Sequence, residues 1–516
     1  QRERLQKQIM KRMKELGINV CLPGYSGMVP HDAKERLGLD VADPGKWNDY
    51  KRPAFLQPTS KRFAEIASIY YKEQQRLYGK ADFYSMDPFH EGGNAGGVDL
   101  RKAGEAIMGA MKAVNPNAVW VVQAWGACPY PSMIKHLKNG DMLVLDLYSE
   151  NRPQWGDPES TWYRKEGFNG HDWAFCMLLN FGGNVGMFGK LQHVVDEYYK
   201  ARQSKFASTL KGVGLTMEGI ENNPVMYELV SELPWRDAKF SWKEWLHDYV
   251  EARYGNINNA KVHDAWLLLA RSVYGAGAKI VEQGCHESVL CARPALDVYQ
   301  VSSWSEMEEF YNPDDVIRAA RLMVEASHEV KANDNFRYDL VDVTRQAIAE
   351  QARYVYDEVV AAYKAKDRKM FDYTTKRFLD ILLQQDRLLS SMPDFMVGGW
   401  IRSARNLGQN EQERNHYEWN ARVQITTWGN RSAAEYGGLR EYAHKEWNGV
   451  LADFYYPRWK AYFEALAATL DGKPMKDIDF YAMDEKWTLQ HNVYPYEAQG
   501  DAVEFSQTAF ENVFGK

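Results

Sequence analysis

Residues 83–123, FYSMDPFHEGGNAGGVDLRKAGEAIMGAMKAVNPNAVWVVQ, place a helix-like segment between two short apolar runs. The runs at 83–86 and 118–123 have the length and the bounding turn residues that are typical of buried strands. The apolar residues of the intervening segment, 99–114, recur at helical spacing. A strand, a helix and a second strand in this order predict a parallel βαβ unit.

The same alternation extends over the first half of the chain. Further apolar runs lie at 19–22, 142–147, 173–179 and 213–217, and further helical segments lie at 60–78, 131–137 and 190–206. This pattern is typical of an α/β barrel or a doubly wound sheet. Because no GxGxxG or P-loop motif opens any of these helices, we favour the α/β class with a (β/α)8 TIM-type barrel.

Such a barrel needs eight strands, and six are visible. Residues 1–16, which precede the first visible strand, have the pattern of a charged helix with Leu5, Ile9 and Met13 on one face. The barrel is therefore expected to lack its first strands, and an upstream segment or another chain is expected to complete it.

After about residue 235 strand-like runs nearly vanish. Long amphipathic stretches follow at 242–254, 260–273, 314–332, 340–365, 369–391 and 435–470. We therefore expect two domains, a catalytic (β/α) barrel over residues 1–238 that is incomplete at its N-terminus and an all-α helical domain over residues 239–516.

Composition excludes several functions. The net charge is −7 and the basic residues are interspersed with acids, so nucleic-acid binding is not expected. No apolar stretch is long enough to span a membrane. The 12 histidines are scattered without an HExxH motif and the five cysteines lack CxxC spacing, so we predict no metal site, no cofactor and no disulfide framework. The 17 Trp and 31 Tyr suit stacking against sugars, as well as ordinary packing.

Two glutamates follow strand-like runs and lie among small residues. They are Glu91, in the segment 81–93, and Glu218, in the segment 213–219. Barrel enzymes keep their catalytic groups at the carboxyl ends of strands. Two carboxyl groups are the usual machinery for cutting a glycosidic bond, so we interpret this pair as catalytic. The alternative is that either glutamate caps a helix or pairs with an arginine.

An ordered series of motifs resembles the α-N-acetylglucosaminidase family, glycoside hydrolase family 89. The motifs are Leu22-Pro-Gly-Tyr-Ser-Gly-Met-Val-Pro30, Phe89-His-Glu91, Val121-Val-Gln-Ala-Trp125, Leu143-Val-Leu-Asp-Leu147, Asn180-Phe-Gly-Gly-Asn184, Gly214-Leu-Thr-Met-Glu-Gly219, Gln424-Ile-Thr-Thr-Trp428-Gly429, Tyr442-Ala443 and Asp453-Phe-Tyr-Tyr-Pro-Arg-Trp459. The resemblance covers nearly the whole chain.

The resemblance implies a (β/α)8 barrel followed by a helical domain, and a retaining exo-glycosidase that releases terminal α-linked N-acetylglucosamine from glycans. It also implies that Glu91 is the general acid/base and Glu218 the nucleophile. In a retaining enzyme the two carboxyl groups lie about 5 Å apart. Glu91 is then expected to donate a proton to the leaving oxygen and later to activate water, while Glu218 attacks the anomeric carbon and forms a covalent intermediate.

The resemblance also points to substrate-binding residues. His90 stands where many relatives have Asn; it can donate to a sugar hydroxyl or to the neighbouring carboxylate, or it can be structural. Trp125 resembles a pocket residue, and packing at the top of the barrel is its alternative. Trp428 and Tyr442 resemble the positions by which the helical domain closes the pocket, although without the resemblance both would be ordinary helix-packing aromatics.

Strand ends add three further candidates for the sugar site, Tyr25, Tyr148 and Asn180. Asp87 is expected to support the loop of Glu91. The glycines of the segment 180–189 are best explained by close approach of backbones, because the segment lacks the lysine of a phosphate-binding loop.

Other functions remain open at this level. The chain could be a catalytically impaired fragment, a carbohydrate-binding relative, or a glycosidase of different sugar specificity on the same scaffold. The expected partner is a glycan with terminal α-linked N-acetylglucosamine. The family's glycan substrates imply a secreted, periplasmic or lysosomal location, although no signal peptide is visible in the chain.

Overall fold

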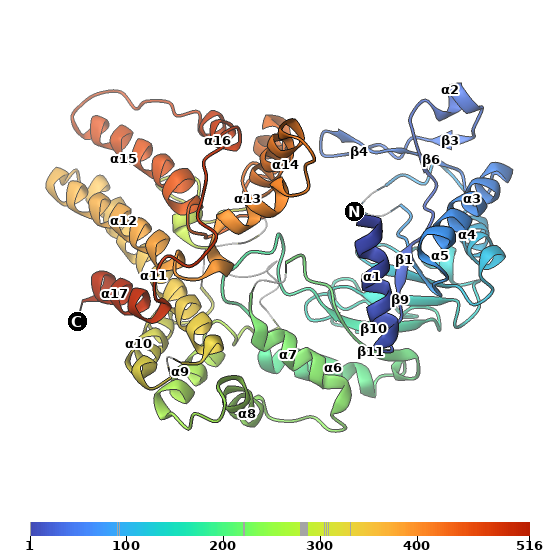
Figure 1. The fold of residues 1–516 in the computed structure, drawn as a ribbon, viewed down its shortest axis with the longest axis horizontal. Helices are drawn as coiled ribbons and strands as arrows, with labels where there is room; N and C mark the ends of the chain where they lie inside the picture. Colours follow the sequence, from blue (N-terminus) through green and yellow to red (C-terminus); the bar gives the residue numbers. More distant parts are fainter. Residues whose placement is uncertain are drawn as a thin grey trace. The chain divides into compact units, whose positions relative to one another are not determined.

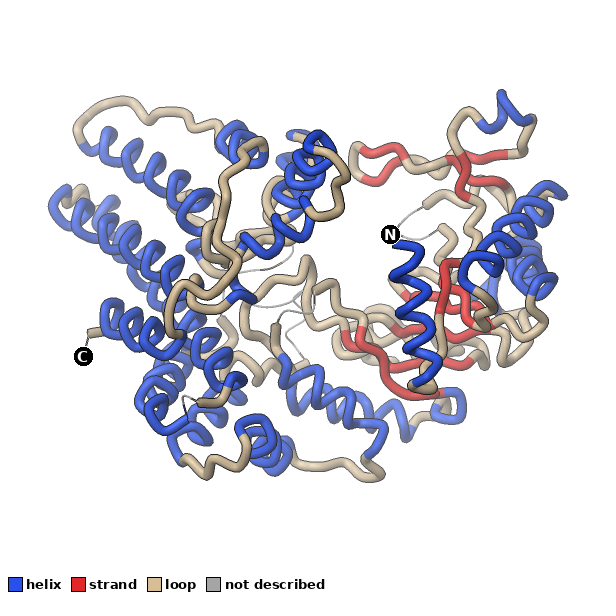
Figure 2. Tube along the Cα trace, viewed as in Figure 1, coloured by secondary structure: helices blue, strands red, loops and turns tan. Residues whose placement is uncertain are grey.

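The structure is a computed structural model that describes residues 2–89, 91, 93–219, 222–278, 287–303, 305, 307, 309–330 and 332–515. The chain forms two compact units. The first unit comprises Gln1–Leu178, Val195–Thr216 and Val230–Asp237, and the second comprises Leu179–Val194, Met217–Leu229 and Ala238–Lys516. The strands belong to the first unit, and the second is largely helical (Figures 1 and 2). The boundary that we expect at residue 238 stays a prediction.

A parallel sheet forms the centre of the first unit. Its six described strands are β1 (Cys21–Pro23), β7 (Phe83–Ser85), β8 (Val119–Ala124), β9 (Met142–Asp146), β10 (Asp172–Met177) and β11 (Leu210–Leu215). They pair in chain order, β1-β7-β8-β9-β10-β11, and every pairing is parallel. All six strands agree with the runs identified in the sequence. Because the order never reverses, it is the order of a barrel wall and not of a doubly wound sheet.

Helices follow the strands as the sequence predicts. Those of the first 237 residues are α1 (Arg2–Glu15), α2 (Ala33–Leu37), α3 (Lys61–Tyr78), α4 (Leu100–Val114), α5 (Pro131–Ile134), α6 (Leu191–Gln203) and α7 (Pro224–Glu232), with 3-10 turns at Ala207–Thr209 and Leu233–Trp235. The Asp99 carboxylate accepts from the Lys102 N–H at 3.2 Å and caps the start of α4. Gly104 lets α4 approach α5, since a Cβ at this position would lie 2.3 Å from the Met133 carbonyl oxygen.

Helix α1 forms as predicted, but its apolar face is largely exposed. The sequence pattern places Leu5, Ile9 and Met13 on one apolar face, but Leu5 is 54% and Ile9 44% exposed. The structure instead buries Met10. The charged helix carries apolar residues on more than one face, and periodicity does not say which of them contacts a neighbour.

Two small antiparallel sheets in the first unit were missed. One has the order β2-β6-β3, formed by Met28–Val29, Ala54–Leu56 and Val41–Ala42. The other pairs β4 (Lys46–Trp47) with β5 (Tyr50–Lys51). Strands of two or three residues are too short to show an alternating pattern.

The second unit is built on long helices. They are α8 (Trp242–Tyr254), α9 (Ala260–Arg271), α10 (Pro313–Val330), α11 (Asp334–Lys364), α12 (Arg368–Leu389), α13 (Val397–Arg405), α14 (Glu411–Gln424), α15 (Tyr456–Leu470), α16 (Phe480–Thr488) and α17 (Ala502–Phe514), with 3-10 turns at Val289–Cys291 and Pro393–Phe395. Buried side chains of α11, α12 and α15 form one apolar core, in which the Trp459 ring contacts Phe378 at 4.8 Å and Tyr356 at 5.0 Å. In the described part of the chain, no helix combines the length and apolarity needed to cross a bilayer.

The stretch 435–470 is not one amphipathic segment. Only Tyr456–Leu470 is regular α-helix, and it follows two π-helical turns, Ser432–Tyr436 and Leu451–Tyr455. Between these turns Gly438 and Gly449 have φ values of +70° and +87°, which end a helix readily. This interruption shapes the loop that carries Tyr442.

Candidate active site

The carboxylate of Glu218 is held by two donors within the second unit. The Gly182 N–H and the Tyr442 hydroxyl both donate to Glu218 Oε2, each at 2.7 Å. Glu218 itself is exposed. Two donors that converge on one oxygen fix its position and leave Oε1 available for other contacts. A carboxylate that is exposed and oriented in this way can reach a ligand.

The loop that supplies the Gly182 N–H is pressed against the loop of Tyr442. Gly182 has a φ of +64°, and a Cβ there would lie 1.9 Å from the Tyr442 carbonyl oxygen. Gly183 also has a φ of +64°, and its Cβ would lie 2.9 Å from the Gly219 Cα. The buried Lys445 ammonium donates to the Gly183 carbonyl. The prediction that these glycines serve close backbone approach is confirmed.

Trp428 and Tyr442 lie side by side in the second unit. Their ring centroids are 5.3 Å apart. Both rings are half-buried, so each keeps a surface that a ligand can contact. An aromatic pair of this kind, beside an oriented carboxylate, suits the apolar face of a sugar.

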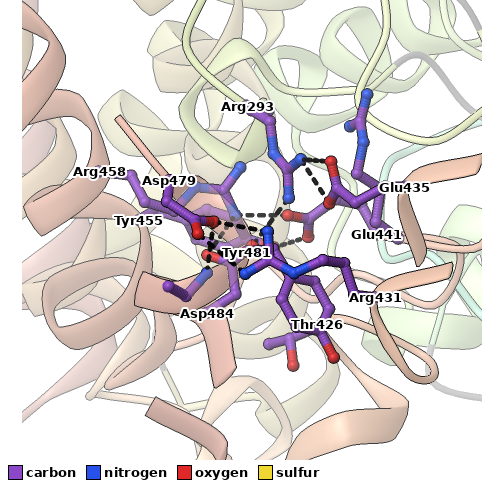
Figure 3. A network of polar contacts seen from close by, with 12 residues as sticks. Arg293, Thr426, Arg431, Glu435, Glu441, Tyr455, Arg458, Asp479, Tyr481 and Asp484 are labelled. Atoms are coloured by element: carbon purple, nitrogen blue, oxygen red, sulfur yellow. Dashed lines mark hydrogen bonds and ion pairs between the residues drawn. The ribbon is translucent and has the colours of Figure 1, made fainter. Parts of the chain in front are cut away.

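A network of polar contacts, most of it buried, surrounds Glu441, the residue before Tyr442 (Figure 3). The Glu441 N–H donates to the Thr426 carbonyl at 2.8 Å, which ties the residue before Tyr442 to the segment before Trp428. The Glu441 carboxylate accepts from Arg458 and from the Tyr455 hydroxyl. The loop is thereby anchored to α15.

Further ion pairs extend this network to α16. Arg293 donates to both Glu435 oxygens at 2.6 Å and to Asp484 at 3.0 Å, and Asp484 lies 3.6 Å from Arg458. Burial raises the pKa of Asp484, and Arg458 opposes that shift. Removing one partner of a buried pair costs about 3–5 kcal/mol, so such a network fixes geometry strongly.

Left-handed backbone conformations gather at the predicted site residues. Among the described residues other than Gly and Asn, φ is positive at Phe89, Glu91, Leu179, Lys366, Trp428 and Glu441. All except Lys366 are predicted site residues or lie within two positions of one. Each such conformation costs roughly 1–2 kcal/mol for a residue with a Cβ. Backbone strain of this kind is found mainly at functional sites. Its position here supports the assignment of these residues to a functional site, and this support does not depend on the motifs.

In the first unit, the loop after β7 presents Glu91. Arg52, which follows the β4–β5 hairpin, donates to the Glu91 carbonyl oxygen at 2.7 Å. The Asp87 carboxylate accepts from the Gln123 N–H at 2.6 Å, so it supports the loop as expected. These contacts hold the backbone, and the Glu91 residue is exposed. His90 lies outside the described residues.

Trp125 and Tyr148 belong to an aromatic cluster at the carboxyl ends of β8 and β9. Their centroids are 6.0 Å apart, and Trp162 contacts Trp125 at 4.8 Å and Tyr148 at 6.5 Å. Tyr148 is buried, whereas Trp125 and Trp162 are half-buried. The cluster therefore offers two indole surfaces from the first unit.

A buried carboxylate anchors the loop that carries Trp162. Asp146 Oδ2 accepts from the N–H groups of Gln154 and Trp155 at 2.8 and 2.9 Å. Burial raises the pKa of Asp146 to about 7, and these hydrogen bonds oppose the rise. Because Asp146 is fully buried, we interpret its role as structural: its carboxylate holds the backbone of the loop at Gln154 and Trp155.

Two other predicted residues are buried. Tyr25 is 8% exposed, and its ring packs against Phe63 and Tyr70 at 5.3 and 5.6 Å. Burial raises the pKa of Tyr25 to about 12. Asn180 is completely buried and donates to the Asn184 carbonyl at 3.0 Å, within the glycine loop. Their contact with a sugar stays a prediction.

Sequence reasoning missed three contributors to these sites, namely Trp162, Arg52 and the Gly182 N–H. Trp162 and Arg52 lie in irregular segments, and a backbone donor leaves no mark in a pattern of side chains. The glycine pair at 182–183 was the signal available for the backbone donor.

Comparisons with known proteins agree with this picture. Residues 1–237 match the family described as the alpha-N-acetylglucosaminidase (NAGLU) tim-barrel domain, and residues 245–512 match the alpha-N-acetylglucosaminidase (NAGLU) C-terminal domain. The chain is 31% identical to the Homo sapiens alpha-N-acetylglucosaminidase over 530 residues, covering 98% of this chain and 68% of that protein.

Solved structures from Clostridium perfringens are also similar. A family 89 glycoside hydrolase in complex with PUGNAc has a TM-score of 0.91 and 32% identity, covering 99% of this chain and 58% of that one. A variant with two glutamates replaced by glutamine, in complex with its substrate GlcNAc-α-1,4-galactose, has a TM-score of 0.92, with 32% identity and the same coverage. The chain thus spans 58% of the length of these solved relatives.

The matched families confirm the predicted fold class, an α/β barrel followed by a helical domain. The motifs, the fold and the relatives all lead to the same assignment. This chain belongs to the α-N-acetylglucosaminidase family, glycoside hydrolase family 89.

Proposed function

We propose that this protein is a retaining exo-glycosidase that hydrolyses terminal α-linked N-acetylglucosamine from glycans. In this proposal Glu218 is the nucleophile and Glu91 the general acid/base. The observation that carries it is the Glu218 carboxylate, exposed and oriented by two donors at 2.7 Å. Family membership and the substrate complex of the Clostridium perfringens relative support the choice of sugar.

The proposed chemistry gives a different role to each of the two carboxyl groups. Glu218 accepts two hydrogen bonds on Oε2, which orient its carboxylate for attack on the anomeric carbon. Glu91 protonates the leaving oxygen as the glycosidic bond breaks. Water then attacks the glycosyl–Glu218 ester while Glu91 takes its proton, and the carboxylate of Glu218 is released.

We assign binding roles to the surrounding side chains in the same proposal. Trp125, Trp428 and Tyr442 are assigned to contacts with the apolar face of the sugar. His90, Tyr25, Tyr148 and Asn180 complete the proposed set. We also propose a division into domains at residue 238 and a secreted, periplasmic or lysosomal location, where such glycans occur.

Product stereochemistry tests the proposed reaction. In a panel of α- and β-linked N-acetylglucosaminides, we expect turnover of the α-linked members only, and the α-anomer of N-acetylglucosamine should appear first in the NMR spectrum. The reason is that two displacements at one carbon restore its configuration. Initial formation of the β-anomer, or cleavage of β-linkages alone, contradicts the proposal.

Gly182→Ala tests the role of the glycine loop. The new Cβ would meet the Tyr442 carbonyl oxygen at 1.9 Å, so the loop must move and carry its N–H away from Glu218. Misplacing a group of the active site by about 1 Å can lower the reaction rate on the order of 100-fold, and we expect kcat/KM to fall by about that factor. The measurement is steady-state kinetics on an aryl α-N-acetylglucosaminide.

Gly472→Ala is the matched control. Gly472 has a similar φ of +77°, but a Cβ there would meet nothing within 4 Å. Both variants carry the backbone strain of roughly 1–2 kcal/mol, and only Gly182→Ala carries the collision. Equal losses of kcat/KM in the two variants would show that the collision at Gly182 does not matter, and would contradict the proposed role of the glycine loop in the active site.

A further inference from the structure

A cluster of metal-ligating side chains lies on the α8–α9 hairpin. His247 and Glu251 are one turn apart on α8, and His263 is near the start of α9. Each offers a ligand atom, and the three atoms lie within 4.8 Å of one another. Residues at i and i+4 share one face of a helix, so α8 presents both of its ligands toward the same neighbour.

The two imidazole rings stack on each other, so one ring must turn before both can direct a nitrogen lone pair at the same ion. Their centroids are 4.6 Å apart and their planes differ by 16°. His263 Nε2 lies 2.5 Å from Glu251 Oε1. Asp248 approaches His247 Nδ1 at 3.7 Å, which places a carboxylate beside the ring nitrogen that is not needed as a ligand if Nε2 binds.

The hairpin that carries these residues is firmly packed. The Tyr249 ring of α8 contacts the Trp266 ring of α9 at 5.4 Å, and the Trp266 indole N–H donates to the Tyr254 hydroxyl at 2.9 Å. That hydroxyl in turn donates to Asp339 of α11 at 2.6 Å. These contacts hold α8, α9 and α11 together beside the cluster.

The donor set matches a known class of metal centre. Two imidazoles and one carboxylate bind Zn²⁺ with bond lengths of about 2.0–2.2 Å, and water can take the remaining position. Ligand atoms around a tetrahedral ion of this size lie roughly 3.3 Å apart. The contact between Glu251 and His263 must therefore lengthen by about 1 Å, which the partly exposed Glu251 side chain can do by rotation.

We propose that His247, Glu251 and His263 form a binding site for a divalent transition-metal ion of the Zn²⁺ class that links α8 to α9. Imidazole favours Zn²⁺, Ni²⁺, Co²⁺ and Cu²⁺ over Mg²⁺ and Ca²⁺, which prefer all-oxygen sites. The ion joins two helices and belongs to no step of the proposed glycoside hydrolysis. The sequence pattern hid the site because its third ligand comes from the next helix.

Isothermal titration of the tag-free protein with ZnCl₂ tests the proposal. We expect one Zn²⁺ per chain with the wild type, a visible d–d spectrum when Co²⁺ is added, and no comparable heat with MgCl₂ or CaCl₂. His263→Ala and His247→Ala should each weaken Zn²⁺ binding at least tenfold. The His247 side chain is 64% exposed, so its replacement leaves the packing intact.

Asp264→Asn is the matched control. Asp264 is exposed and adjacent to His263 on α9, but it is not part of the cluster. Its replacement should leave both the stoichiometry and the affinity unchanged. The proposal is overturned if the wild type binds no Zn²⁺, if either histidine variant binds as tightly as the wild type, or if Mg²⁺ binds equally well.

Discussion

Glu218→Gln should reduce kcat on an aryl α-N-acetylglucosaminide by roughly 10⁴-fold or more, the scale of loss when a catalytic nucleophile is removed. The amide cannot attack the anomeric carbon. The fold should remain, because the Gly182 N–H and the Tyr442 hydroxyl both donate to Oε2, and the carbonyl oxygen of glutamine can accept both bonds. Steady-state kinetics and the melting temperature together measure the effect.

Glu464→Gln serves as the control for Glu218→Gln. Glu464 is an exposed residue of α15, so the same change there should alter neither activity nor stability measurably. A Glu218→Gln variant that keeps a tenth of the wild-type kcat would refute the assignment of the nucleophile. A large fall in melting temperature would instead place Glu218 among the residues that hold the fold.

The strand order of the first unit could be predicted from the sequence because its signal is local. Each buried strand is a short apolar run, and the apolar residues of each helix recur at helical spacing. Both patterns can therefore be recognised in the sequence without knowledge of the packing. The β2-β6-β3 sheet could not be predicted in this way. Its strands of two or three residues depend on partners up to 27 residues away, such as Phe55 on Met28.

The candidate site was predictable only in part for a related reason. Motif resemblance identified Glu218, Trp428 and Tyr442, but not that Tyr442 donates to the Glu218 carboxylate from 224 residues away. It also gave no sign that a buried arginine, Arg458, fixes the loop through Glu441. Such contacts depend on the tertiary fold, whereas a motif records residue types at fixed spacing.

Glu91→Ala should show a loss of rate that depends on the leaving group. A disaccharide leaves as a poor alkoxide and needs the proton from Glu91, so its kcat should fall by about 10³–10⁴-fold. A dinitrophenyl glycoside leaves without protonation and should form the glycosyl–Glu218 ester at a nearly normal rate. The ester then accumulates, because no base activates water, and a burst of dinitrophenol in stopped-flow absorbance reports it.

Sodium azide should restore turnover of the Glu91→Ala variant. The azide anion attacks the anomeric carbon of the ester without losing a proton, the carboxylate of Glu218 leaves, and the product is the α-glycosyl azide. The loop should keep its shape, since Arg52 donates to the Glu91 backbone carbonyl and not to its side chain. Glu105→Ala, an exposed carboxylate paired with Arg101 on α4, should behave as wild type. An equal loss for both leaving groups, with no rescue by azide, would assign Glu91 to positioning and not to proton transfer.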